Sequence, residues 1–260
     1  MNLAFQADVA GFQSNSQRAR VLTETWAAKN LYCPNCDSSS LGLTPNYTPA
    51  VDLICRQCDE GYQLKSGKSA PGVRIVDAGY EAMIRSIRSN AAPNLVYLHY
   101  VPDFGVRNLL LIPRFFFTEA SIEKRNPLAE TARRAGWVGC NIRLDRIAPE
   151  GRIDVVTDGI CVESSHVRDR YRALAPLREI PPSVRGWALA VLLKVHKLGC
   201  NEFRLDEIYA FESELAHEFP DNNNIRPKIR QQLQVLRDLK VLEFVGKGQY
   251  RLASVGIFGG

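Results

Sequence analysis

Four cysteines in two CxxC pairs constrain this chain more than any other feature of its sequence. The pairs are Cys33/Cys36 in CPNC and Cys55/Cys58 in CRQC. Four thiolates at this spacing can hold a tetrahedral zinc ion, which a single CxxC pair cannot do. Protein ligands would fill all four positions of that ion and leave no metal-bound water for catalysis, so we predict a structural zinc.

The composition indicates an ordinary folded protein. The chain has 260 residues, 45% of them hydrophobic, which is enough for one large domain or two medium ones. The opening MNLAFQADVAG lacks the pattern of a signal peptide, and no later stretch is apolar over the thickness of a bilayer. Seven cysteines, four of them in metal-type pairs, fit a reducing compartment. We expect a soluble, cytoplasmic protein in which Cys140, Cys161 and Cys200 are buried thiols.

Positive charge is concentrated near the C-terminal end. The whole chain has a formal net charge of +5, and residues 222–251 alone hold seven lysines and arginines against two acidic residues, Asp238 and Glu243. Nucleic-acid contact depends on local rather than overall positive charge. This stretch is therefore the first candidate for a DNA-binding surface.

The first part of the chain mixes helical and strand patterns. Apolar spacing predicts a helix over 14–29, a strand, metal knuckle and strand over 51–65, and further strands over 95–101, 109–113 and 153–156. Asp77 can cap a helix whose apolar face is formed by Tyr80, Met83, Ile84 and Ile87.

The second part follows a proline-rich linker. Residues 173–184 contain three prolines and show no helical periodicity, so we place a domain boundary near Pro181 and expect domains at 1–180 and 181–260. Helical patterns then cover 185–198, 205–219 and 225–239, followed by two short strands around Gly246-Lys247-Gly248. Three helices followed by a hairpin is the order of a winged helix.

A candidate nuclease centre surrounds the second cysteine pair. Side chains alternate along a strand, so Gln63 and Lys65 share one face, and Asp52 on the partner strand can meet them. An aspartate and a second oxygen ligand holding Mg²⁺, with a lysine near the attacking water, would suit the metal-assisted hydrolysis of PD-(D/E)xK nucleases. The pattern is short, and a solvated aspartate and lysine on a strand edge is the alternative.

Long stretches of the chain resemble the DpnI type of methyl-directed restriction endonuclease. They are PLAETARRAGWVGCNI at 127–142, the nested cysteines, IRQQLQVLRD at 229–238, SNSQRAR near the start, RGW at 185–187 and FES at 211–213. The resemblance implies an α/β (α+β) PD-(D/E)xK nuclease domain with an embedded structural zinc, followed by a winged helix. It also implies cleavage of double-stranded DNA at GATC whose adenine is N6-methylated, with Asp52 and Lys65 as the catalytic aspartate and lysine.

Gln63 departs from that family pattern, which has glutamate in E-L-K. An amide oxygen can ligate Mg²⁺, but it lacks the negative charge that offsets dehydration of the ion. Asp59 or Glu60, just after the second cysteine pair, is a candidate for the missing carboxylate. We expect weak or Mn²⁺-favouring cleavage, and an inactive chain is the open alternative.

Two further groups of residues are candidates for DNA contact. The resemblance places Trp137 at the methylated adenines, where an indole offers a flat apolar surface, and Arg133 and Arg134 can bind phosphates or guanine edges. A core tryptophan is the alternative for Trp137. In the third C-terminal helix and the wing, arginine, glutamine and lysine side chains can reach bases or phosphates; these are Lys228, Arg230, Gln231, Gln232, Gln234, Arg237 and Lys247.

The leading interpretation is a methylation-dependent type II restriction endonuclease with structural Zn²⁺ and catalytic Mg²⁺ or Mn²⁺, the latter held by Asp52 and Gln63. The alternative is a methyl-DNA-binding protein with weak or no cleavage, and a protein-binding zinc scaffold comes third. No P-loop and no GxGxxG with an acidic partner is present, so we expect no nucleotide cofactor. The family analogy suggests a monomer.

Overall fold

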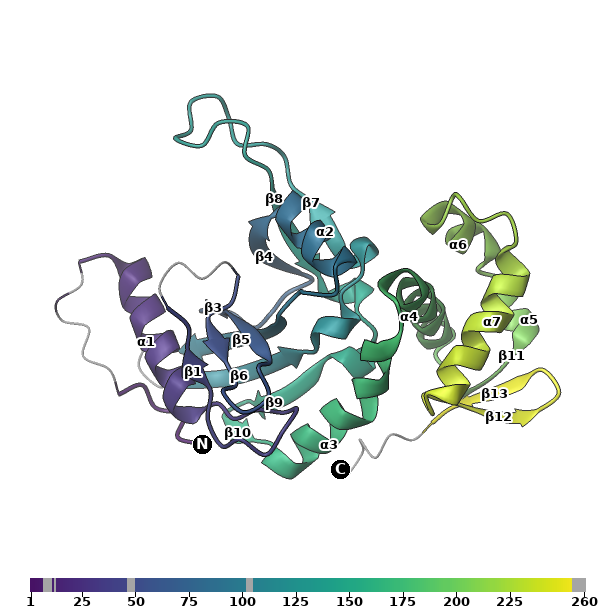
Figure 1. Cartoon of the computed structure of the whole chain (residues 1–260), viewed down its shortest axis with the longest axis horizontal. Helices are drawn as coiled ribbons and strands as arrows, with labels where there is room; N and C mark the ends of the chain where they lie inside the picture. Colours follow the sequence, from purple (N-terminus) through teal and green to yellow (C-terminus); the bar gives the residue numbers. More distant parts are fainter. Residues whose placement is uncertain (7–10, 12, 46–49, 102–104, 254–260) are drawn as a thin grey trace.

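The computed structural model describes residues 1–6, 11, 13–45, 50–101, 105–253 of the chain. Within these ranges the largest element is a mixed sheet of seven strands in the order β1-β2-β3-β5-β6-β9-β10 (Figure 1). Its one parallel pair is β3 with β5, and the remaining neighbours are antiparallel. The strands are β1 Gly42–Leu43, β2 Leu53–Ile54, β3 Gly61–Gly67, β5 Asn94–Val101, β6 Gly105–Ile112, β9 Ile153–Thr157 and β10 Ile160–Cys161.

Two helices flank this sheet. Helix α1, Asn15–Asn30, buries Thr23, Trp26 and Ala27, a narrow face at helical spacing. The hydroxyls of Thr23 and Ser66 lie 3.5 Å apart, which places this face against β3. Helix α3, Ser164–Leu174, contacts β9 and buries Val167, Tyr171 and Leu174.

A smaller sheet lies beside the main one (Figure 1). Its order is β4-β8-β7, with β4 Arg74–Gly79, β8 Gly139–Arg143 and β7 Ile122–Lys124. Helix α2, Tyr80–Arg88, follows β4 directly and buries Met83, Ile84 and Ile87, as the sequence predicts. The predicted cap is wrong, because β4 continues to Gly79 and this glycine, not Asp77, precedes the helix. Five short 3₁₀ turns complete this part: η1 Arg114–Phe116, η2 Glu119–Ser121, η3 Leu144–Arg146, η4 Pro149–Gly151 and η5 Ala175–Glu179.

The C-terminal part has the helices and wing that the sequence predicts, with two differences. The expected helix over 205–219 is divided into α5 and α6, because Ala210 and Phe211 make i to i−3 backbone bonds that close α5. A short strand, β11, was also missed, and it pairs with β13 of the wing. The elements are α4 Pro182–Lys197, β11 Glu202–Arg204, α5 Leu205–Tyr209, α6 Glu212–Glu218, α7 Ile225–Asp238, β12 Leu242–Gly246 and β13 Gln249–Leu252.

Two further expectations concern the unpaired cysteines and membrane spans. Cys140 is buried as predicted, whereas Cys161 and Cys200 are exposed, because Cys161 lies on the edge strand β10 and Cys200 follows the end of α4. Across the described ranges, none of the helices combines the length and apolar character needed to cross a bilayer.

Arg185 ties the start of α4 to the first part of the chain. The predicted linker is partly helical, since η5 occupies 175–179 and α4 begins at Pro182. Arg185 is only 2% exposed, and its guanidinium donates to Ile180 O at 3.2 Å and Asn90 Oδ1 at 3.0 Å. Burial lowers the pKa of Arg185 to about 10. The residue remains charged at neutral pH and joins α4 to the carbonyl of Ile180 and to the side chain of Asn90.

Replacing Arg185 is expected to destabilise the protein. Arg185→Ala removes a buried side chain and leaves the partly buried acceptors on Ile180 and Asn90 without this donor, so the free energy of unfolding should fall by roughly 2–4 kcal/mol. Urea denaturation followed by circular dichroism measures the change. Arg230→Ala on the exposed face of α7 is the control and should stay within about 0.5 kcal/mol. Equal losses in the two variants would contradict this role for Arg185.

Candidate metal and nuclease site

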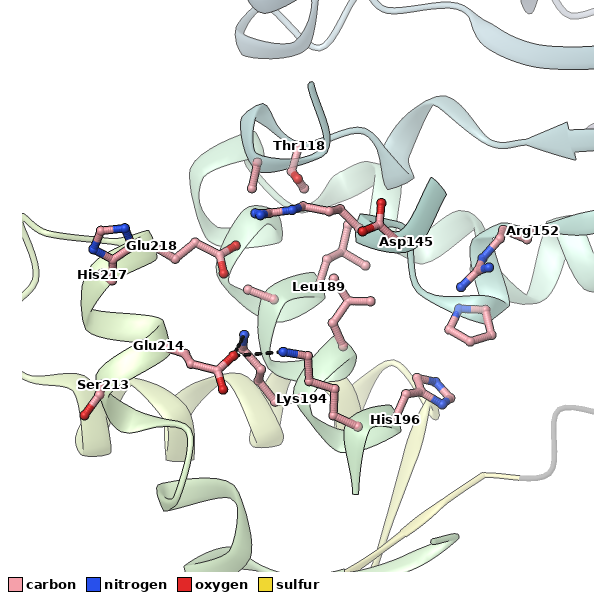
Figure 2. A pocket seen from close by; sticks show the side chains of 16 residues that line it. Thr118, Asp145, Arg152, Leu189, Lys194, His196, Ser213, Glu214, His217 and Glu218 are labelled. Atoms are coloured by element: carbon pink, nitrogen blue, oxygen red, sulfur yellow. Dashed lines mark hydrogen bonds and ion pairs between the residues drawn. The ribbon is translucent and has the colours of Figure 1, made fainter. Parts of the chain in front are cut away.

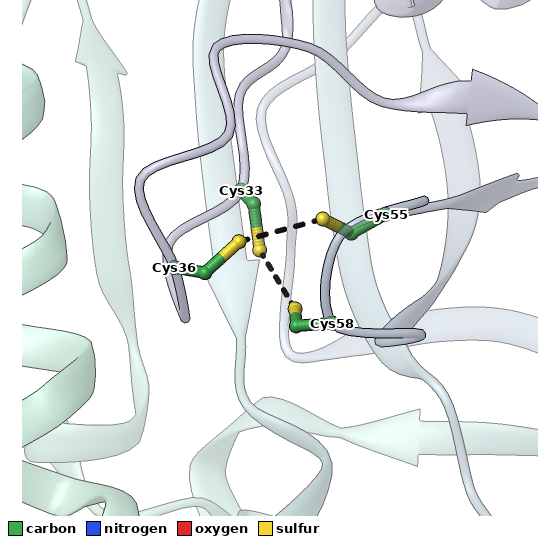
Figure 3. Close-up of side chains that lie close together, drawn as sticks. All are labelled: Cys33, Cys36, Cys55 and Cys58. Carbon is green, nitrogen blue, oxygen red and sulfur yellow. Dashed lines mark hydrogen bonds between the residues drawn. The ribbon is translucent and has the colours of Figure 1, made fainter.

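The four paired cysteines converge in one cluster (Figure 3). Their sulfur atoms all lie within 4.8 Å of one another, with Cys33 Sγ 3.6 Å from Cys58 Sγ and Cys36 Sγ 3.5 Å from Cys55 Sγ. A tetrahedral zinc with Zn–S bonds of about 2.3 Å requires sulfur–sulfur separations of about 3.8 Å. The cluster can therefore hold a structural metal such as zinc, and its residues match those predicted.

The surrounding side chains hold both knuckles in place. The Tyr62 hydroxyl lies 3.2 Å from Cys33 Sγ, and Asn35 Nδ2 donates to Cys58 Sγ at 3.4 Å. Arg168 on α3 donates to the carbonyl groups of Cys33 and Cys36, both at 3.1 Å. These contacts orient the cysteines from outside the cluster, as the hydrogen bonds around metal ligands commonly do.

Asp52 lies at the start of the metal-pinned hairpin. The backbone N–H of Asp52 donates to Tyr62 O at 2.9 Å, and Asp52 Oδ2 accepts from the N–H of Leu64 at 2.7 Å. The side chain thus extends the ladder by one bond beyond the end of β2. Its carboxylate is fixed beside the central residue of Gln63-Leu64-Lys65.

Gln63 and Lys65 reach the same carboxylate oxygen on another strand. Gln63 Nε2 donates to Asp77 Oδ1 at 2.9 Å, and Lys65 Nζ lies 2.8 Å from that atom. The side chain of Asp77 is 1% exposed and that of Lys65 is 27% exposed. The site therefore lies where β3 of the main sheet faces β4 of the small sheet, and Lys65 forms the part open to solvent.

The two carboxylates suggested for the site serve other purposes. Glu60 is buried and its carboxylate accepts from Asn94 at 2.9 Å and pairs with Arg178 at 3.2 Å. Asp59 is exposed, with φ of +58°, in the turn of the second knuckle. These contacts engage Glu60 away from Gln63, and none of the described hydrogen bonds or ion pairs joins Asp59 to Gln63. The carboxylate that does contact Gln63 is that of Asp77, and no motif in the sequence links these two residues.

Trp137 lies on the long β7–β8 connection, which projects from the small sheet (Figure 1). Gly136 has φ of +74°, and backbone bonds between Leu128 and both Gly136 and Trp137 close the base of the projection. The indole is half-buried against Gly139, where an added Cβ would lie 2.9 Å from the ring. Arg134 stacks over the indole at 4.8 Å. Arg133 and Arg134 are exposed, so cationic and aromatic groups gather on the sheet that carries Asp77.

The predicted contact residues of α7 divide into exposed and buried sets. Lys228 is half-buried, 6.0 Å from the ring of Trp187, and Arg237 donates to the adjacent Asp238. Gln232 is wholly buried, so its predicted contact with DNA is wrong. Its side chain lies on the buried side of α7 with Ile229, Leu233 and Leu236. The exposed members are Arg230, Gln231, Gln234 and Arg237, together with Lys247 in the β12–β13 turn.

A broad cavity of about 830 Å³ lies elsewhere, between the two parts of the chain (Figure 2). Thr118 and Asp145 line one side, and Leu189 and Glu214 the other. Lys194 and Lys197 both reach Glu214 at 2.8 Å across the cavity. None of the predicted site residues lines it.

The fold and the site define a mixed α/β protein with a four-cysteine metal cluster and a C-terminal helix–turn–helix domain. Residues 1–180 match the family model of DpnI, described as the Dam-replacing family, and residues 183–252 match that of the Dam-replacing HTH domain. The chain therefore belongs to the DpnI, or Dam-replacing, family. This confirms the resemblance and the fold class predicted from the sequence, and the helix–turn–helix match supports DNA binding.

Loss of one cluster ligand is expected to remove the metal and destabilise the protein. Cys58→Ser should reduce zinc from about one ion per chain and lower the melting temperature by roughly 10 °C or more, since several kcal/mol of binding energy are lost. Elemental analysis and a thermal melt measure the two effects. Cys161→Ser, an exposed cysteine outside the cluster, is the control. Full zinc content in Cys58→Ser would contradict the assignment.

Proposed function

We propose that this protein is a methylation-dependent restriction endonuclease that cleaves double-stranded DNA at GATC containing N6-methyladenine. Membership of the DpnI family carries the proposal. The contacts of Asp52, Gln63 and Lys65 at the middle of β3 support it, because they bring a carboxylate, an amide and an amine to adjacent positions. Zinc is proposed as the metal of the cysteine cluster.

The proposed chemistry is hydrolysis of a phosphodiester bond. Asp52 and the amide oxygen of Gln63 would hold Mg²⁺ or Mn²⁺, which when bound supplies charge stabilisation for the phosphate. Lys65 Nζ pairs with Asp77 at 2.8 Å, and the lysine side chain is 27% exposed to solvent. Its ammonium can turn from Asp77 to a phosphate oxygen or to the attacking water. Asp52, fixed by the Leu64 N–H, stays in place during that movement.

The proposed division of labour follows the two parts of the chain. Residues 1–180 would cut DNA, and residues 181–260 would add DNA contacts through α7 and the wing. The exposed arginines and glutamines of α7 suit base edges in the major groove, and Lys247 suits a phosphate. Trp137 would contact the methylated adenine, with Arg133 and Arg134 on neighbouring phosphates or guanines. We propose a monomer acting in the cytoplasm without a nucleotide cofactor.

A methyl-DNA-binding protein without cleavage remains the second candidate, and one contact favours it. Lys65 and Asp77 balance each other's charge and Gln63 adds none, so Asp52 alone carries a negative charge that Lys65 does not balance. A site with one unbalanced carboxylate attracts Mg²⁺ less than a site with two. Both functions predict salt-sensitive binding to methylated DNA, so cleavage alone separates them.

The deciding experiment compares adenine-methylated and unmethylated copies of one plasmid, incubated with Mg²⁺ or with Mn²⁺. We expect fragments only from the methylated copy, with faster cleavage in Mn²⁺. Gln63→Glu should raise the rate in Mg²⁺ by about tenfold or more, because it adds a charged oxygen ligand. Lys65→Met is the inactive control. A methylation-dependent mobility shift without cleavage in either ion would establish the binding-protein function instead.

Trp137 is expected to determine the preference for methylated DNA. Trp137→Ala removes the apolar surface and should weaken binding to a methylated duplex by roughly tenfold or more, since aromatic contacts to bases contribute about 1–3 kcal/mol each. Binding to the unmethylated duplex should change less. Fluorescence anisotropy with both duplexes measures the ratio, and Trp187→Phe, in the core near Phe219, is the control. An unchanged ratio would exclude Trp137 from methyl recognition.

A further inference from the structure

Asp77 is the one charged group that touches both Gln63 and Lys65 in the described part of the structure. It comes from β4, outside the β2–β3 hairpin that carries the predicted residues. Both contacts end on Oδ1, at 2.9 Å and 2.8 Å, so this oxygen lies where the two side chains of β3 terminate. A carboxylate that is 99% buried is costly unless a charge compensates it. Lys65 supplies that compensation here.

The chemistry of Mg²⁺ and Mn²⁺ requires more negative charge than Asp52 and Gln63 provide. Hard divalent cations are held by oxygen ligands, and carboxylates offset the cost of removing their water. The hydrogen bond from Gln63 Nε2 to Asp77 leaves Oε1 of that amide free to face another group. A cation bound by Gln63 Oε1 would thus lie close to the carboxylate of Asp77.

We infer that Asp77 is a ligand of the catalytic cation and supplies the second carboxylate that Gln63 lacks. The inference rests on the proposed nuclease function. In the absence of the cation, Lys65 occupies the oxygen that the cation would use. Cation binding therefore releases Lys65 from Asp77, and Lys65 is the side chain that the proposed chemistry needs at the phosphate.

The relation between Lys65 and the cation gives the inference a distinctive signature. Because both compete for Asp77, Lys65→Met should strengthen cation binding, although it removes the amine needed for cleavage. A lysine that merely lay near the site would not compete for a ligand. Binding and activity should therefore change in opposite directions in this one variant.

The test is a titration of the zinc-loaded, full-length protein with Mn²⁺, with free Mn²⁺ followed by electron paramagnetic resonance. Asp77→Asn should weaken Mn²⁺ binding by about tenfold or more, and Lys65→Met should tighten it. The double variant Gln63→Glu/Asp77→Asn, called the exchanged pair below, keeps one carboxylate and one amide with their positions swapped. Its Mn²⁺ affinity should therefore lie within about threefold of that of the unaltered protein. Glu123→Gln, a carboxylate in the same small sheet bonded to Arg74 and Arg143, is the matched control.

The outcomes separate this inference from the proposed function. Unchanged Mn²⁺ affinity in Asp77→Asn would overturn the role of Asp77 and leave the nuclease intact. Failure of the unaltered protein to bind Mn²⁺, even with a methylated duplex present, would overturn the proposed function itself. If Asp77→Asn folds poorly by circular dichroism and zinc content, the exchanged pair decides. Full Mn²⁺ affinity in the exchanged pair supports the inference, and its loss in a folded, zinc-loaded exchanged pair contradicts it.

Discussion

The four-cysteine cluster is the constraint on which the candidate site depends. Strand β2 has only two residues, and its pairing with β3 consists of Leu53 opposite Tyr62 and Ile54 opposite Gly61. So short a strand pair has little stability by itself. A metal shared by the two knuckles would close the turn after β2 and tie it to the loop after α1. Asp52 directly precedes β2, so the register that such a metal would stabilise also places its carboxylate beside Leu64.

The same cluster is connected to the C-terminal part through three arginines, of which Arg185 is fully buried. Arg168 binds the carbonyl groups of the first knuckle, and Arg178 of η5 donates to Asn35 in that knuckle at 3.1 Å. Arg178 also pairs with Glu60 beside the second knuckle. Arg185 then fastens α4 to Ile180 just after η5. The path from the metal to the helix–turn–helix domain therefore runs through fixed, charge-assisted bonds rather than through a loose linker.

Local patterns in the sequence predicted most helices and strands and the four clustered cysteines well. CxxC spacing and apolar periodicity depend on residues that are close together in the sequence, which is why they can be recognised from it. The strands β5, β6 and β9, helix α7 and the wing fall where the patterns indicate. Asp77 was assigned to a helix cap, because its contact with Gln63 joins two sheets and leaves no mark in local spacing. Gln232 was assigned to DNA because a polar residue ordinarily faces solvent, yet its position on α7 turns it inward with Leu233 and Leu236.

At position 63 this chain has glutamine where the family pattern has glutamate. The contact between Gln63 and Asp77 explains how this difference can favour the fold while weakening cation binding. A glutamate at position 63 would set two carboxylates against each other beside a single lysine, a repulsion that only a cation would relieve. Glutamine instead donates a hydrogen bond to Asp77 and adds no second negative charge beside it. This contact favours the metal-free fold, and it would lower the affinity for a cation. Under the function and the role of Asp77 proposed above, the rate of DNA cleavage would then depend on how much of the missing charge Asp77 supplies.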